Sequence, residues 1–231
     1  PDQNADQVII KELYTTGVPI ENDPKNFFQM DKGFILYNNG GKTAVISNLA
    51  IGILDPYNAH SVANAWYSTG ATEPSYVSQG WVPAACGIWY FPNSLIIEPY
   101  SQVVISCMGA IDNTKTYPQS INYANKDYYT MYDPESGFKN PKYYPTPADV
   151  IPTSQYLKAV EYGQANAWPL SATSPGFFIF QTKNTTPAAF ANDASNITYT
   201  PGKAQNKINA VLKVPTDWII DGVEVYEKIN E

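Results

Sequence analysis

The chain has 231 residues, of which 44% are hydrophobic and only 15% are charged, and its formal net charge is −7. A typical globular domain carries roughly 25% charged residues, so amides, hydroxyls and phenols must cover much of this surface. All 14 cationic residues are lysines, because the chain contains no arginine. Nucleic-acid-binding proteins use a basic stripe and arginine forks, so this composition argues against a nucleic-acid partner.

The amino-terminal sequence PDQNADQ is polar and lacks the pattern of a signal peptide, so we expect a mature or trimmed chain that follows a tether. No run of about 18 apolar residues occurs, and therefore no transmembrane helix is predicted. Cys86 and Cys107 are expected to be buried thiols, with a disulfide as the alternative in an oxidising compartment. Neither a metal site nor a cofactor is predicted.

Short apolar segments bounded by proline, glycine or asparagine predict an all-β protein. The first strands are expected at residues 8–14 and 34–37, and NNGG at residues 38–41 is a tight-turn signal. We therefore expect residues 45–54 to return as the hairpin partner of residues 34–37. Many short strands with turns between them favour a sandwich. The further expected strands are residues 88–91, 102–108, 177–181, 208–214 and 218–226.

Helical signals are few in this chain. The spacing of apolar residues predicts short helices over residues 59–67, 154–162 and 187–194. The stretch from residue 117 to residue 153 contains six prolines and is expected to be a long loop. Loops of that length are usually functional or carry their own local packing.

Two sets of motifs carry a resemblance to known families. VIIKELY at residues 8–14, FILYNN at 34–39 and TAVISNLA at 43–50 together resemble the lamin-tail type of immunoglobulin-like domain. A closer resemblance, to exported lipoproteins of unknown function from gut Gram-negative anaerobes, is carried by three later motifs. These are LIIEPYSQVVIS at residues 95–106, FFIF at 177–180 and VPTDWIIDGVEV at 214–225.

The resemblance implies an immunoglobulin-like, lamin-tail-like β-sandwich. It also implies export to the cell surface or periplasm, with a lipid anchor on a cysteine upstream of residue 1, and it supplies no catalytic residue. We therefore expect a single sandwich domain over residues 1–231 that contains both chain ends, with an aromatic and proline-rich insertion at about residues 57–168. That interval holds 14 of the 18 tyrosines and four of the five tryptophans.

The aromatic residues have two interpretations. They can cover the sandwich and hold down long loops, or they can form a binding face for a glycan or a protein, because tyrosine and tryptophan combine a large apolar area with a polar tip. With no arginine present, such recognition is expected to be neutral and based on shape. The candidate ligand-binding residues are Trp66, Trp81, Trp89, Tyr128, Tyr129, Tyr132, Tyr143 and Tyr144.

Signals for catalysis are weak. His60 is the sole histidine, and no Gly-x-Ser-x-Gly motif accompanies it. A glycoside hydrolase requires two carboxyl groups at a fixed separation, for which the candidates are Glu12, Glu98, Asp221 and Glu224. We therefore expect a non-catalytic surface or secreted module for binding or adhesion. The alternatives are a carbohydrate-binding component of a glycan-uptake system, a glycoside hydrolase and a structural spacer.

Overall fold

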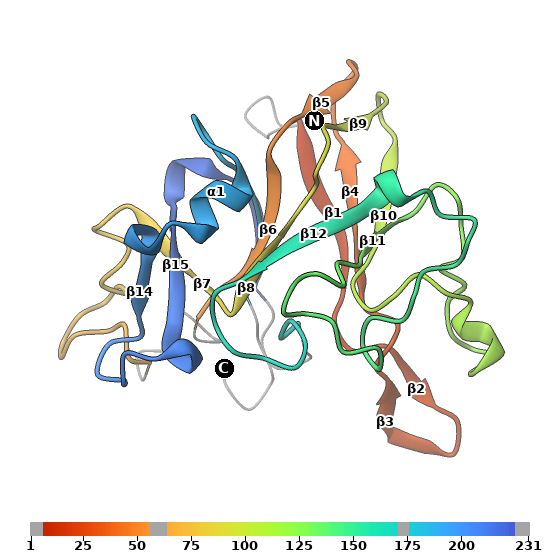
Figure 1. Ribbon diagram of the computed structural model, residues 1–231, viewed down its shortest axis with the longest axis horizontal. Helices are drawn as coiled ribbons and strands as arrows, with labels where there is room; N and C mark the ends of the chain where they lie inside the picture. Colours follow the sequence, from red (N-terminus) through yellow and green to blue (C-terminus); the bar gives the residue numbers. More distant parts are fainter. Residues whose placement is uncertain (1–6, 56–63, 171–175, 225–231) are drawn as a thin grey trace. The chain divides into compact units, whose positions relative to one another are not determined.

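The computed structural model describes residues 7–55, 64–170 and 176–224 (Figure 1). It is mostly β, because 39% of it is strand, arranged in several sheets, and 10% is helical. This confirms the all-β prediction. The chain divides into two compact units, each built from two separate stretches. Unit 1 comprises Pro1–Ser47 and Phe91–Lys158, and unit 2 comprises Asn48–Tyr90 and Ala159–Glu231.

Unit 1 is built on a sheet whose order is β1-β4-β10-β11-β12 (Figure 1). β1 and β10 flank β4 antiparallel, whereas β11 pairs parallel with both β10 and β12. Apolar side chains of β4 and β10 that point to one face, such as Phe34 and Ile105, are fully buried. The strands are β1 (Val8–Tyr14), β4 (Gly33–Asn38), β10 (Gln102–Ser106), β11 (Tyr129–Met131) and β12 (Tyr156–Glu161).

β12 corrects one prediction, because residues 154–162 do not form a helix. They form a 3₁₀ turn (Thr153–Gln155) followed by the strand, and the division between the two units falls after Lys158. Leu157 is completely buried and pairs with Met131 across the ladder. Strand pairing and burial therefore override the helical spacing of the apolar residues.

The expected hairpin between residues 34–37 and 45–54 is also wrong. β5 (Ala44–Ile46) pairs instead with β9 (Leu95–Ile97), whereas β6 (Leu49–Ile53) belongs to unit 2. Both edges of β4 are occupied by β1 and β10, and the buried Asn38 at its end contacts β9 instead. Its Nδ2 donates to the carbonyl oxygens of Lys42, Ile97 and Glu98 at 2.8, 2.9 and 3.1 Å.

A second hairpin of unit 1, β2 (Val18–Ile20) and β3 (Asp23–Phe28), projects beyond the ends of β1 and β4 (Figure 1). It is anchored by Tyr117, whose hydroxyl donates to the Pro19 carbonyl and accepts from the Glu21 amide, both at 2.7 Å. Tyr117 comes from the expected loop over residues 117–153, which is indeed irregular except for β11.

Unit 2 contains an antiparallel sheet of order β8-β6-β13-β16 and a three-stranded sheet of order β14-β15-β7. Helix α1 (Pro187–Asn192) confirms the helix expected over residues 187–194 and packs Phe190 and Ala191 into a core with strand residues such as Phe180 and Leu212. The strands are β7 (Trp81–Ala85), β8 (Gly87–Tyr90), β13 (Gly176–Gln181), β14 (Ile197–Tyr199), β15 (Ala210–Pro215) and β16 (Ile219–Glu224).

The aromatic interval over residues 57–168 contributes to both units. β1 belongs to unit 1 and β16 to unit 2, so the strands nearest the two chain ends are found in different units. A single sandwich domain over residues 1–231 stays a prediction.

Two further predictions concern small segments. His60 and most of the helix expected over residues 59–67 lie outside the described residues. Cys86 and Cys107 are free thiols that belong to different units, and burial raises the pKa of the Cys86 thiol to about 11. Within the described part of the chain, no helix is long and apolar enough to cross a membrane.

Candidate ligand-binding face

One face of the unit 1 sheet carries polar, aromatic and apolar side chains, and its Val104 packs against a core cluster that includes the buried Tyr123 and Ile151. The register aligns Tyr14 with Gly33, and Ile35 with both Glu12 and Val104. Side chains alternate between the two faces of a strand, so these aligned positions share one face, which we call the open face. Its residues are Ile9, Glu12, Tyr14, Gly33, Ile35, Tyr37, Gln102, Val104 and Ser106.

A β-bulge adds a cation to the open face. The register of β1 shifts between Ile10 and Glu12, which leaves Lys11 as the extra residue. A bulge re-aims the side chain of the extra residue. Here the Lys11 Nζ donates to Gln102 Oε1 at 2.6 Å and lies 5.4 Å from the centre of the Tyr37 ring.

A cavity of about 170 Å³, which we call cavity A, opens beside this face. Tyr14 and Val104 form its sheet side, and Ile121, Tyr123 and Tyr128 from the long loop form the other. Burial raises the pKa of Tyr123, so its phenol stays protonated and neutral. The remaining lining residues are Gly33, Phe34, Ile35 and Gln102.

A second cavity of about 320 Å³, cavity B, is lined by residues 13–18 together with Asp31 and Ile121. Tyr14 and Ile121 line both cavities, so the two adjoin at this pair. Gly17 is required in the wall of cavity B because its φ is +90° and an added Cβ would lie 2.0 Å from the Phe28 carbonyl oxygen.

Asp31 is the charged residue of cavity B, and only 1% of its surface is exposed. Its Oδ1 accepts hydrogen bonds from Asn113 Nδ2 at 3.3 Å, from the Ile121 amide at 3.4 Å and from the Ser120 hydroxyl. Its Oδ2 has no hydrogen-bond partner among the residues that the structure describes. Buried polar atoms are normally satisfied, so this oxygen requires an explanation.

Tyr14 stands at the junction of the two cavities and is 42% exposed. Its hydroxyl donates to the carboxylate of Glu12, and this hydrogen bond, followed by burial, raises the pKa of Tyr14. The ring is therefore neutral and held in place, with one side available to a ligand.

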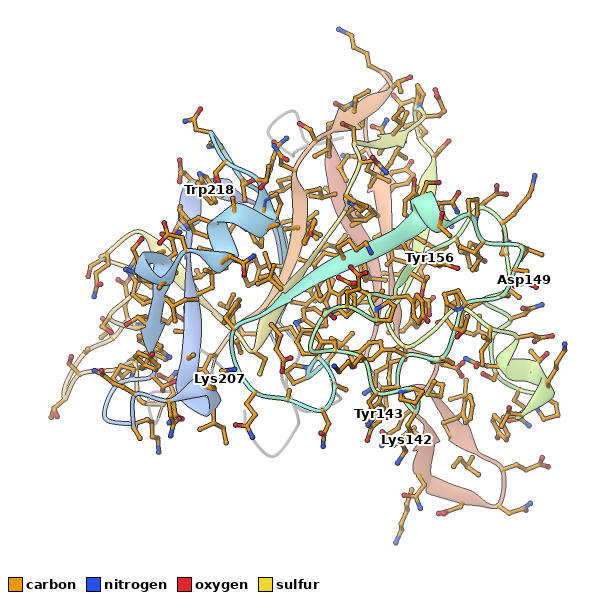
Figure 2. The ribbon with its side chains drawn as sticks, viewed as in Figure 1. Lys142, Tyr143, Asp149, Tyr156, Lys207 and Trp218 are labelled. Carbon is orange, nitrogen blue, oxygen red and sulfur yellow. The ribbon has the colours of Figure 1, made fainter. Side chains whose placement is uncertain are left out.

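The structure separates the tyrosines predicted to bind a ligand. Tyr128 lines cavity A, whereas Tyr144 is buried against Phe138 at a ring distance of 6.4 Å. The others lie outside both cavity linings: Tyr129 packs on Phe91, Tyr132 packs on Tyr156, and Tyr143 lies beside Lys142 (Figure 2).

The three candidate tryptophans belong to unit 2. Trp66 and Trp81 pack edge to face at 5.6 Å, and Tyr76 completes the cluster. Trp66 is 4% exposed and Trp89 is 0% exposed, so no ligand reaches either ring in this structure. These positions agree with the interpretation in which aromatic rings hold loops in place.

The carboxylates considered for hydrolysis are divided between the units, with Glu12 and Glu98 in unit 1 and Asp221 and Glu224 in unit 2. Glu98 accepts a hydrogen bond from the Thr43 hydroxyl at 2.9 Å. Over residues 7–55, 64–170 and 176–224, no group of three histidine, cysteine or acidic side chains is arranged to hold a metal ion.

Sequence reasoning missed Lys11, Tyr14, Asp31, Tyr37 and Gln102. The spacing of β1 gave no sign of its bulge, and nothing in the local sequence distinguishes Asp31 from a surface carboxylate. Gln102 precedes two valines, so this strand shows no alternation of polar and apolar residues that would mark its exposed face.

The fold and the open face define a mostly β protein with several sheets and a mixed aromatic and polar surface. The chain belongs to the family described as "Protein of unknown function (DUF4876)", whose model matches residues 98–231. The expected family of unknown function is thereby confirmed.

The chain is similar to the crystal structure of a DUF4876 family protein from Bacteroides thetaiotaomicron VPI-5482 at 2.50 Å resolution. The TM-score is 0.69 at 19% sequence identity, over 98% of this chain and 55% of that chain. The likeness concerns the fold, and this chain spans about half the length of that relative. Comparison with the curated proteins gives no match.

Proposed function

We propose that this protein is a non-catalytic binding module that binds carbohydrate on the open face of unit 1. The observation that carries the proposal is the partly exposed Tyr14 ring between two cavities, with the polar groups of Lys11, Glu12 and Gln102 on the same sheet face.

This combination suits a sugar. A sugar ring presents apolar C–H groups that pack on an aromatic face, and hydroxyls that both donate and accept hydrogen bonds. Tyr14 and Tyr128 supply rings, whereas Gln102 supplies an amide and Lys11 an ammonium group. The lack of arginine disfavours a phosphorylated ligand, because bidentate phosphate recognition is absent.

A binding role is favoured over hydrolysis by the way the nearby carboxyl groups are held. Glu12 accepts the hydrogen bond of Tyr14, and Oδ1 of Asp31 accepts three hydrogen bonds. Both groups are fixed by protein donors, which suits a preorganised binding site.

We also propose an exported, lipid-anchored location and an immunoglobulin-like, lamin-tail-like sandwich, on the basis of the sequence motifs. The antiparallel pairing of β1 with β4 agrees with the order of the motifs at residues 8–14 and 34–39. Protease treatment of intact cells that express the full-length protein tests the location. Degradation without cell lysis supports surface exposure, and protection until lysis contradicts it.

Binding to a glycan array, followed by isothermal titration calorimetry with the best ligand, tests the carbohydrate proposal. We expect Tyr128→Ala to weaken binding by about tenfold, because it removes a ring from the lining of cavity A. Tyr143→Ala is the matched control, because Tyr143 lies outside both cavity linings and beside Lys142 (Figure 2). An array without any bound glycan, or equal effects of the two variants, contradicts the proposal.

A further inference from the structure

We infer that Asn39 is a site of spontaneous covalent modification, at which the side-chain amide is hydrolysed to a carboxylate, and that the side chain of Asn38 protects it in the folded protein. Asn39 and Gly40 lie in the turn between β4 and β5 (Figure 1). They form the only Asn-Gly pair in the sequence.

The reaction starts at the backbone nitrogen of Gly40. This nitrogen gives up its proton and attacks Cγ of Asn39, so that a new C–N bond closes a five-membered imide and the side-chain nitrogen leaves as ammonia. Water, the only co-reactant, then adds to one of the two imide carbonyls and breaks its C–N bond. The product is aspartate or isoaspartate, and the Gly40 nitrogen regains its proton. Glycine favours the attack because it has no side chain to obstruct the nitrogen and its backbone rotates freely.

In the folded protein, the attacking nitrogen is already engaged. The Gly40 amide donates to Oδ1 of Asn38 at 2.9 Å, and the Asn39 amide donates to the carbonyl oxygen of Gln7 at 2.7 Å. The peptide groups on both sides of Asn39 are therefore held. Removal of the Gly40 proton requires the loss of a hydrogen bond, and rotation of the nitrogen toward Cγ requires the turn to open.

Asn38 is a fixed acceptor for the Gly40 amide. Its exposed fraction is 0%, and its Nδ2 donates to the carbonyl oxygens of Lys42, Ile97 and Glu98. These three hydrogen bonds orient the side chain so that Oδ1 accepts from Gly40. Asn39 should therefore react when the turn separates from β9, in a local opening or in the unfolded chain.

Incubation of the full chain at mildly alkaline pH, with and without urea, tests the inference. Trypsin cleaves after Lys32 and Lys42, so mass spectrometry of the peptide 33–42 measures the conversion of Asn39. We expect the conversion to be at least about tenfold slower in the folded protein than in urea, because the folded turn must first lose its hydrogen bonds.

Two glycine variants identify the attacking nitrogen in urea. Gly40→Ala places a methyl group beside that nitrogen and should slow the conversion of Asn39 at least about tenfold. Gly41→Ala is the matched control and should leave the rate unchanged, because the Gly41 nitrogen does not attack. An added Cβ at either position would lie 3.3 Å from a side-chain atom in the folded protein, so the two changes are comparable.

Asn38→Ala tests the protection without urea. It removes the acceptor of the Gly40 amide and should speed the conversion at least about tenfold. Gly33→Ala controls for loss of stability, because it also disturbs β4, where an added Cβ would lie 2.7 Å from the Ile105 oxygen, but it retains Asn38. Equal acceleration by the two variants overturns the inference. Equal rates with and without urea, or faster conversion of another asparagine in urea, also overturn it.

Discussion

Gly33 shows how a single residue shapes the open face. A Cβ at this position would lie 2.7 Å from the backbone oxygen of Ile105 and 3.3 Å from the hydroxyl of Tyr123. The first distance is too short for a carbon–oxygen contact, and the obstructing atom belongs to the neighbouring strand. Glycine is therefore required at position 33 of β4, because the Ile105 carbonyl of β10 and the buried Tyr123 leave no room for a side chain.

We predict that Gly33→Ala lowers the free energy of unfolding by about 1–3 kcal/mol, because β4 and β10 must separate to admit the methyl group. Chemical denaturation measures the change. Gly222→Ala is the control, since its added Cβ would make only ordinary contacts of 3.5 and 3.6 Å. Equal stability of the two variants would contradict the prediction.

We predict that Asp55 in unit 2 makes the free energy of unfolding depend on pH. Burial raises its pKa above the ordinary value of 3.8, although a hydrogen bond from the Thr200 hydroxyl at 2.8 Å opposes the shift. As the pH rises above 3.8, Asp55 loses its proton more readily in the unfolded state than in the folded state. The contribution of Asp55 to the free energy of unfolding therefore falls as the pH rises from 3.8 through its raised folded-state pKa.

The comparison of Asp55→Asn with the natural protein isolates this effect. Denaturation curves at several pH values from acidic to neutral should show that the natural protein loses stability relative to the variant as the pH rises. Unfolding free energies that differ by a constant amount across the range would show that Asp55 titrates alike in both states.

At the scale of elements, Asn38 links the end of β4 to β9. Its side-chain amide donates to three carbonyl oxygens, and its Oδ1 accepts from the Gly40 amide at 2.9 Å. The amide thus joins the loop after β4 to β9. The Lys42 and Glu98 oxygens also accept from Gln7 Nε2 and from the Ser101 amide.

We predict that Asn38→Asp destabilises the protein by at least about 2 kcal/mol, because a carboxylate would face the carbonyl oxygens of Lys42, Ile97 and Glu98 without a donor. Thermal or chemical unfolding measures the loss. Asn39→Asp, at the neighbouring half-buried position, should change stability far less, and a similar loss in both variants would count against the role assigned to Asn38.

Strand positions could be predicted from the sequence more readily than strand partners. Apolar segments bounded by turn residues located β1, β4, β8, β10 and β13, because that pattern is local. The pairing of β4 with β10 could not be predicted, since β10 lies far along the chain. The helix predicted over residues 154–162 is the strand β12, because a short apolar segment fits both the helical and the strand spacing of apolar residues.

The candidate site was less predictable than the fold. Among the residues expected to bind a ligand, Tyr128 lines cavity A, whereas Trp66, Trp89 and Tyr144 are buried. Aromatic composition identifies residues with large surfaces but does not distinguish a core from a binding face. The bulge at Lys11 and the burial of Asp31 arise only when distant segments meet.

On the scale of the whole molecule, the chain passes between the two units three times, after Ser47, Tyr90 and Lys158. A fragment of residues 1–158 contains every segment of unit 1 but lacks the second half of unit 2. β6 then loses its partner β13, and β7 loses its partner β15.

Hydrogen exchange monitored by mass spectrometry should reveal this division in the 1–158 fragment. We expect the amides of β4 and β10 to stay protected, whereas those of β7 exchange rapidly, in contrast to the full chain. Protection of β7 in the fragment would show that the first part of unit 2 folds without the second.

The interleaved path also sets an order of events during synthesis. The ribosome releases β6 and β7 long before β13 begins at Gly176 and β15 at Ala210. Such distant partners slow folding and leave apolar strand edges exposed to other chains in the meantime. The nascent polypeptide therefore keeps these strand edges unpaired until its last third has emerged.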